Sequence, residues 1–164
     1  MIEKNIDFHD DAKVSLIEGV NKVADAVSST LGAAGTTVIL EDQTGRPHIT
    51  KDGVTVAKTI NLSDPVEHLA AEIIKQASIK TADEAGDGTT TSIVLARAII
   101  RNAFEKIKEN PKINVTKLRE EIEYLSDKVY QYLDKKAKPV DEQSVESVAT
   151  ISANNDATLG KIIS

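Results

Sequence analysis

The 164-residue sequence contains no cysteine and no tryptophan, and aromatic residues make up only 3% of it. The absence of cysteine excludes disulfide bonds and cysteine-ligated metal centres. With so few aromatic residues, a core has to be built from Val, Ile, Leu and Ala, which suits closely packed helices. Because 40% of the residues are hydrophobic, the chain can bury a core of the size expected for one ordinary domain.

Basic stripes and long apolar runs are missing as well. The net charge of −6 repels a nucleic-acid backbone on average, so we expect no nucleic-acid partner. No stretch approaches the roughly 20 apolar residues of a membrane-spanning helix, so no membrane partner is expected either. Residues 1–8 match neither a secretory signal nor an Arg-rich transit peptide. These features together predict a cytoplasmic protein.

Apolar periodicity predicts a mainly α chain with one small β-hairpin. The hairpin strands are expected at 37–40 and 48–50. The helix that follows Gly88 is apolar on all sides in its first half, which predicts a central, buried element. Helices are expected over about 12–31, 54–59, 64–85, 89–109, 118–133 and 141–150, and from 157 onwards.

The C-terminal part of the sequence predicts a boundary and an incomplete end. The run Lys135–Pro139 is typical of a linker. A turn is expected over 151–155. The final helix has about two turns, an exposed apolar face and no C-cap, which natural domains seldom show at their end. We therefore expect a fragment, or a chain that completes itself with another segment.

One loop carries the strongest chemical signal, and it directly precedes the most apolar helix: Gly86-Asp87-Gly88-Thr89-Thr90-Thr91. A helix N-terminus has unpaired N–H groups, glycines allow close approach, and threonine hydroxyls add donors, which is how a phosphate site is built. Asp87 would repel phosphate unless a divalent cation bridges the two, so the loop predicts Mg²⁺ and a metal–nucleotide. The alternative is a glycine turn with Asp and Thr capping the next helix.

Two further loops can join this site. The first is Thr30-Leu31-Gly32 at the end of the first helix, where a plain glycine C-cap is the alternative. The second is Lys51-Asp52-Gly53. Its lysine can neutralise phosphate charge, and Asp52 can orient a water for attack at phosphorus. An aspartate N-cap beside a solvated lysine explains the same residues equally well.

Taken together, the loops resemble those of group I chaperonins, the GroEL-type folding machines. The resemblance covers about 6–164 and implies a chaperonin equatorial-domain-like helical bundle with a small β-hairpin, incomplete. It places the N-terminal half of an equatorial ATP-binding domain at 1–136 and the truncated start of an intermediate domain at 137–164. Four motifs carry it by order and spacing: Thr30-Leu31-Gly32, Thr50-Lys51-Asp52-Gly53-Val54-Thr55-Val56-Ala57, Ala85-Gly86-Asp87-Gly88-Thr89-Thr90-Thr91 and Ile151-Ser152-Ala153-Asn154.

The resemblance also implies roles for the loop residues in binding ATP, Mg²⁺ and a monovalent cation such as K⁺. Asp52 would help to arrange the attacking water, Asp87 would bind Mg²⁺, and Lys51 would lie near the phosphates and the monovalent cation. The other nucleotide-binding positions would be Thr30, Leu31, Gly32, Gly86, Gly88, Thr89, Thr90, Thr91, Ile151 and Ser152.

Partners follow from the same resemblance. Segments 4–8 and 38–50 would pair across neighbouring subunits of a homo-oligomeric ring. Client proteins and a co-chaperonin would bind through the apical domain of the family, which this sequence lacks, together with the returning half of the equatorial domain. The sequence departs from the family at Ala33-Ala34, where Pro-Lys is usual, and elsewhere it looks divergent, as in a viral or specialised paralogue.

Three functions are compatible with these observations. The first is a segment of a chaperonin ATPase that assists protein folding in a ring, with weak nucleotide binding or none on its own. The second is a stand-alone Mg²⁺-dependent nucleotide hydrolase. The third is a non-enzymatic helical module that associates with chaperonin rings.

Overall fold

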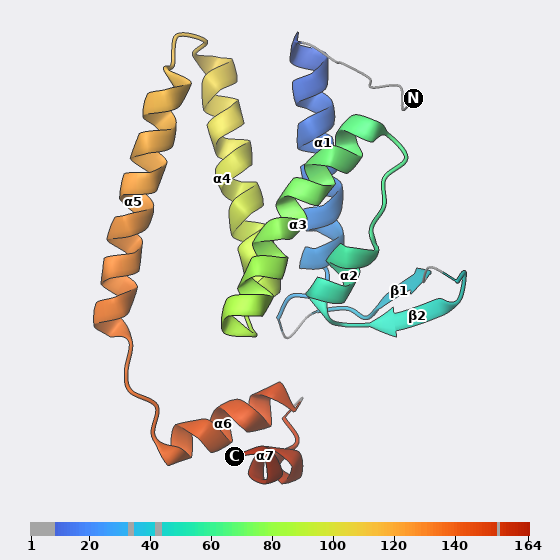
Figure 1. Cartoon of the computed structure of the whole chain (residues 1–164), viewed down its shortest axis with the longest axis vertical. Coiled ribbons are helices and arrows are strands. Elements are labelled where there is room, and N and C mark those ends of the chain that lie inside the picture. The colour runs from blue at the N-terminus through green and yellow to red at the C-terminus, as the bar shows by residue number, and fades with distance from the viewer. Residues whose placement is uncertain (1–8, 33–34, 42–43, 154) are drawn as a thin grey trace. The chain divides into compact units, whose positions relative to one another are not determined.

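The computed structural model describes residues 9–32, 35–41, 44–153 and 155–164 (Figure 1). They form two compact units, which divide between Ile113 and Asn114 and are described separately. The expectations for segment 4–8 and for Ala33-Ala34 lie outside the described residues. The domain boundary expected at 136/137 stays a prediction.

The described elements confirm a mainly helical chain with a small antiparallel hairpin. The first unit contains α1 (His9–Ser28), β1 (Val38–Glu41), β2 (Pro47–Thr50), α2 (Gly53–Thr59), α3 (Pro65–Ala85) and α4 (Thr89–Glu109). The second contains α5 (Val115–Lys136), α6 (Glu142–Ser152) and α7 (Ala157–Ile163).

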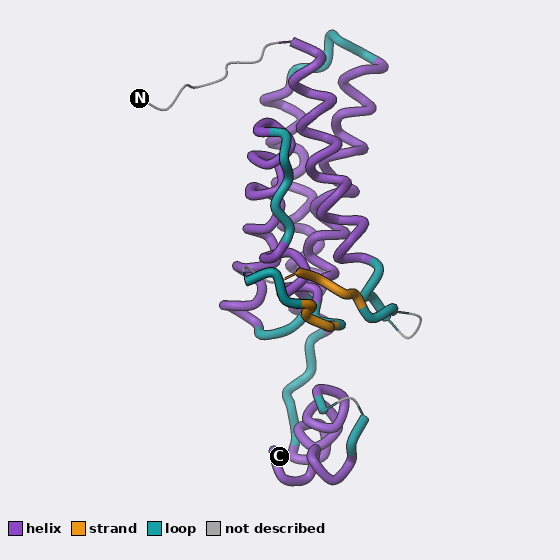
Figure 2. The backbone as a smooth tube through the Cα atoms, turned by 90° about the vertical axis from the view of Figure 1, so that its right-hand side faces the viewer, coloured by secondary structure: helices purple, strands orange, loops and turns teal. Residues whose placement is uncertain are grey.

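The core of the first unit lies where α1, α2, α3 and α4 meet, and its buried members are small aliphatic residues. This agrees with the composition, because side chains without rings let helices approach closely. The hairpin lies beside one end of this bundle in both views (Figures 1 and 2), where β1 contacts α2. The buried residues are Val20, Val23, Ala24, Val27, Val56, Ala57, Ala70, Ala71, Ile74 and Ile93.

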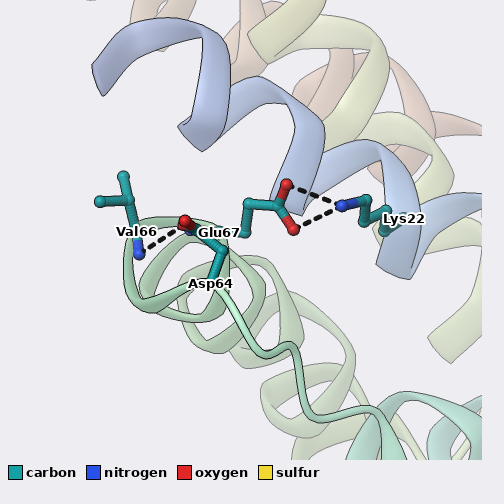
Figure 3. A network of polar contacts seen from close by, with 4 residues as sticks. All are labelled: Lys22, Asp64, Val66 and Glu67. Carbon is teal, nitrogen blue, oxygen red and sulfur yellow. Dashed lines mark hydrogen bonds and ion pairs between the residues drawn. The ribbon is translucent and has the colours of Figure 1, made fainter. Parts of the chain in front are cut away.

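The contact between α1 and α3 combines a close backbone approach with a polar network. A Cβ on Gly19 would lie 2.2 Å from the backbone oxygen of Glu67, so only glycine fits there. The Glu67 carboxylate accepts two hydrogen bonds from Lys22 Nζ, at 2.7 and 2.5 Å (Figure 3). Asp64 begins α3 by accepting from the N–H groups of Val66 and Glu67, both at 2.9 Å, and Pro65 follows in the first turn, as expected.

The expectation that α4 is a central, buried helix is wrong for this chain. Among its residues only Ile93 is fully buried, while Leu95 and Ile99 are 58% and 48% exposed. Within the first unit, α4 contacts α1, α2 and α3 along one face. Apolar side chains on the remaining surface of α4, such as Leu95 and Ile99, are therefore left exposed by these neighbours.

Two helix ends also differ from the expectation. Helix α1 ends at Ser28, before the glycines, where the hydroxyls of Ser28 and Ser29 donate to the carbonyls of Asp25 and Ala26. Such side-chain bonds compete with helix continuation. Helix α6 extends through Ser152, so the turn expected from 151 begins later.

The second unit has a short helical hairpin, in which α6 packs on α7, and a long helix α5. A Cβ on Gly160 would lie 2.1 Å from Thr150 Oγ1, so the two short helices are in close contact. Helix α5 carries the expected apolar stripe, but none of its residues is buried. No helix in the described part of the chain is both long and apolar enough to span a membrane.

Candidate functional site

Helix α4 begins with free N–H groups. Gly86 ends α3 in the left-handed conformation, with its N–H donating to the Ala82 carbonyl at 3.0 Å, and Gly88 is the N-cap of α4 at φ 79°. The cap makes no side-chain hydrogen bond, and the Asp87 carboxylate accepts from the N–H of Gly88 at 2.6 Å. The glycine turn of the alternative interpretation is therefore present, whereas the side-chain cap that it expected from Asp or Thr is not seen at Gly88. A helix N-terminus without a side-chain cap is the kind of place where an anion binds.

Asp52 is the N-cap of α2. Its carboxylate accepts from Val54 N at 3.2 Å, from Thr55 N at 3.0 Å and from Thr55 Oγ1 at 2.6 Å. Burial raises the pKa of Asp52, but the hydrogen bonds from Thr55 and Val54 outweigh it, so the pKa lies below its ordinary value. The capping alternative thus describes Asp52 correctly. Its carboxylate is nonetheless exposed and ionised, as a water-orienting group has to be.

Gly53 lies where the loop before α2 packs against the start of α4 and the end of α1. It is buried, and a Cβ built on it would lie 2.1 Å from Thr90 Oγ1 and 3.2 Å from Val27 Cγ1. Thr90 belongs to the first turn of α4, and Val27 to the last turn of α1. The starts of α2 and α4 and the end of α1 therefore meet at one point, at the lower end of the first unit in Figure 1.

The loop after α1 is tied back to the same helix end. Thr30 donates to the Val27 carbonyl through both N and Oγ1, at 3.1 and 2.7 Å. Gly32 has φ 73°, so the glycine turn expected there is present, and its carbonyl accepts from Gly35 N at 2.9 Å. Leu31 is 45% exposed. This loop can therefore line a ligand beside the N-terminus of α4.

The remaining predicted residues differ in position. Lys51 is exposed directly before the Asp52 cap, on the shared end of the first unit. Ile151 and Ser152 are exposed in the last turn of α6, in the second unit, which is described separately.

Asp87 is the carboxylate of the loop that directly precedes α4. In the described segments, no group of three or more His, Cys, Asp or Glu side chains could hold an ion. Mg²⁺ commonly binds through one or two carboxylates plus phosphate oxygens and waters. Asp87, exposed beside the uncapped α4 terminus, fits a cation that arrives with a nucleotide rather than one held by the protein alone.

Sequence reasoning missed the packing role of Gly53. It treated Lys51-Asp52-Gly53 as a polar loop, whereas Gly53 is the residue that admits Thr90. The available signal was a glycine in the first helical turn, directly after an aspartate cap. Glycine there costs helix stability, which suggests close backbone approach.

Comparison with known proteins agrees with a chaperonin fold. Residues 23–164 match the TCP-1/cpn60 chaperonin family. The chain therefore belongs to this family, whose members are ring-forming, ATP-dependent protein-folding machines.

Two solved chaperonins illustrate the similarity. The chaperonin gp146 from the bacteriophage EL 2 (Pseudomonas aeruginosa), crystallised in the presence of ATP-BeFx, is 33% identical with a TM-score of 0.79, over 93% of this chain and 27% of its own. A group III chaperonin in the open state is 25% identical with a TM-score of 0.77, over 93% of this chain and 30% of its own. The present chain thus spans less than a third of either relative.

Proposed function

We propose that this chain is the nucleotide-binding N-terminal segment of a chaperonin subunit that hydrolyses ATP to assist protein folding in a homo-oligomeric ring. The observation that carries the proposal is the contact of Gly53 with Thr90 and Val27. It brings three loops with phosphate-binding chemistry to one end of the first unit. The phage relative, whose crystals were prepared with ATP-BeFx, supports a nucleotide ligand.

The proposed roles follow the chemistry of each group. The N–H groups and hydroxyls of Thr89, Thr90 and Thr91 bind phosphates, and Gly86 and Gly88 let the backbone approach them. Asp87 holds Mg²⁺, and Lys51 offsets phosphate charge near a K⁺ site. Asp52 arranges the attacking water. Thr30, Leu31 and Gly32 line the pocket. The roles that the resemblance implies for Ile151 and Ser152, near the base and ribose, stay an expectation.

Finer assignments belong to the same proposal. The residues of the four motifs favour a group I chaperonin. The similarity to a phage protein agrees with the divergence of the rest of this sequence from that group. Clients and a co-chaperonin would bind through regions that lie outside this chain. A cytoplasmic location stays a prediction.

Replacement of Asp87 by Ala tests the site. Because the carboxylate bonds to the N–H of the adjacent Gly88 and does not cap α4, the helices should remain folded. We expect Mg²⁺-dependent ATP binding, followed by NMR titration, to weaken by about tenfold or more, since the cation loses a protein carboxylate. Binding without Mg²⁺ should not weaken.

The matched control is Asp83→Ala, which removes the same charge from an exposed position near the end of α3. It should bind Mg-ATP almost as the unmodified chain does. Equal affinities for the Asp87 and Asp83 variants would contradict the metal role. Unchanged spectra of the Thr89–Thr91 amides in the unmodified chain at millimolar Mg-ATP would contradict the nucleotide site itself.

A further inference from the structure

One charged residue interrupts the stripe of α4 that faces the core. Thr90, Ile93, Arg97 and Ile100 follow at three- and four-residue steps, which places them on one helix face. Ile93 is fully buried, and Ile100 packs against the same core. Arg97 keeps only 23% of its side chain exposed, and its guanidinium donates to the Asp25 carboxylate of α1.

The pair lies close to two of the nucleotide loops. Asp25 is in the last turn of α1, and its backbone carbonyl accepts from Ser29 N at 3.2 Å, where the loop to Gly32 begins. Arg97 lies two helical turns after Thr90 on the same face. The Asp25–Arg97 pair therefore connects the helix that ends in one loop to the helix that begins with the other.

Two directional contacts bear on the position of α4 along its neighbours. Ser92 Oγ donates to the Ala77 carbonyl of α3 at 3.2 Å, and Arg97 donates to Asp25 of α1. Of these two, the second joins α4 to the helix that leads into the Thr30–Gly32 loop. Burial of Val, Ala and Ile side chains is non-directional, so it favours contact without selecting one alignment. A charge-assisted hydrogen bond from a guanidinium has a defined geometry and selects one. A small shift of α4 along α1 would separate Thr90 from Gly53 and turn the first N–H groups away from the Thr30–Gly32 loop.

We propose that Arg97 is a positioning residue, whose ion pair with Asp25 aligns the N-terminus of α4 with the loop after α1 for phosphate binding. The inference rests on the proposed nucleotide function. Beyond that function, it states that phosphate binding depends on Arg97, which lies two helical turns from Thr90 and does not touch the ligand.

Helix α1 offers a matched control. One turn before Asp25, Lys22 also makes a long-range ion pair, but its partner Glu67 belongs to α3 rather than to α4. Only 12% of the Glu67 side chain is exposed. Loss of Lys22 therefore strands a largely buried carboxylate and should cost stability, but the pair does not join α1 to α4.

The test compares Arg97→Gln, Asp25→Asn, their double variant, Arg97→Lys and Lys22→Gln, each in the complete chain. Mg-ATP affinity is measured by NMR titration, and thermal stability by circular dichroism. We expect Arg97→Gln to weaken affinity about 2- to 5-fold, the factor that corresponds to an ion pair of up to about 1 kcal/mol. Asp25→Asn should do the same, and the double variant should be no worse than either single one. Arg97→Lys should recover part of the loss.

Lys22→Gln should lower the unfolding temperature at least as much as Arg97→Gln and leave the affinity unchanged. Equal affinity losses in the Arg97 and Lys22 variants would mean that Arg97 acts only by stabilising the fold, which would overturn the inference. Additive losses in the double variant would overturn the pairing with Asp25.

A ligand-free arm separates this inference from the proposed function. Amide chemical shifts of Gly53 and Thr89–Thr91 report the alignment of α4 without nucleotide. We expect Arg97→Gln to shift them and Lys22→Gln to leave them in place. If the unmodified chain binds no nucleotide, the proposed function fails. Unshifted amides in the Arg97 variant would still overturn the alignment role on their own.

Discussion

At the residue scale, Asp52 combines two demands on one carboxylate. Its oxygens cap α2 through Val54 and Thr55, and the same group is the proposed organiser of the attacking water. A cap needs the ionised form only for strength, whereas a water-orienting group needs it to accept a hydrogen bond. The lowered pKa of Asp52 therefore serves both.

Replacement of Asp52 separates the two roles. Asp52→Ala removes the cap and should lower the free energy of unfolding at pH 7 by about 0.5–2 kcal/mol. Asp52→Asn keeps a capping oxygen, so its stability loss should be smaller. Phosphate release, where the assembled protein shows it, should fall in both variants because neither can act as a carboxylate. Urea unfolding and a phosphate assay measure the two effects.

The lowered pKa also predicts a pH dependence. A carboxyl group whose pKa is lower in the folded state stabilises the fold fully above its unfolded pKa. That contribution disappears as the pH falls from about 4 through the folded value. The stability difference between the unmodified chain and Asp52→Asn should therefore be constant near neutral pH and shrink in this acidic window. A difference that does not change with pH would contradict the assignment.

At the element scale, the angle and spacing between α1 and α3 depend on a glycine. Gly19 lets α1 approach the backbone of α3 at Glu67, and the ion pair between Lys22 and Glu67 joins the same two helices one turn further along α1. Helix propensity alone would favour Ala at this position by about 1 kcal/mol. The observed glycine is therefore explained by packing between helices.

Replacement of Gly19 by Ala should destabilise the protein in spite of its better helix propensity. The new Cβ would meet backbone atoms, which cannot rotate away, so the two helices have to separate. Overpacking of this kind typically costs about 1–3 kcal/mol. Thermal unfolding checks the loss. The adjacent Glu18→Ala, at an exposed position, should stay within about 0.5 kcal/mol, and a Gly19 variant as stable as this control would contradict the packing argument.

At the scale of the whole molecule, apolar surface is the dominant feature of the second unit. Helices α5, α6 and α7 together expose large hydrophobic side chains at many positions, among them Leu125, Val148, Ile151 and Ile162, each 59–75% exposed. Contiguous exposed apolar surface marks contact with other protein segments. A helical module that associates with chaperonin rings, the third function considered above, would use such a surface.

The isolated chain should therefore bind Mg-ATP much more weakly than a complete chaperonin subunit. The starts of α2 and α4 and the end of α1 meet in the first unit, and the ligands proposed there are for phosphates rather than for the base. Calorimetry on this chain and on the complete phage gp146 subunit, side by side, measures the difference. Steady ATP turnover by a 164-residue monomer would instead support a stand-alone hydrolase.

Local chemistry in the sequence determined much of this protein. Periodicity located the helices and the hairpin, and Asp52 could be expected as a cap because capping involves only adjacent residues. Motif order indicated a chaperonin, as the family match confirms. The individual ligand roles, by contrast, stay predictions.

Only the tertiary structure decided which residues meet. No local pattern links Val27, Gly53 and Thr90, or Asp25 and Arg97, because each contact joins segments far apart in the chain. The extent of burial of α4 was likewise misjudged, since an apolar sequence states what a helix can bury but not which neighbours are present to cover it. Burial is a property of packed surfaces, so it is settled only when the segments come together.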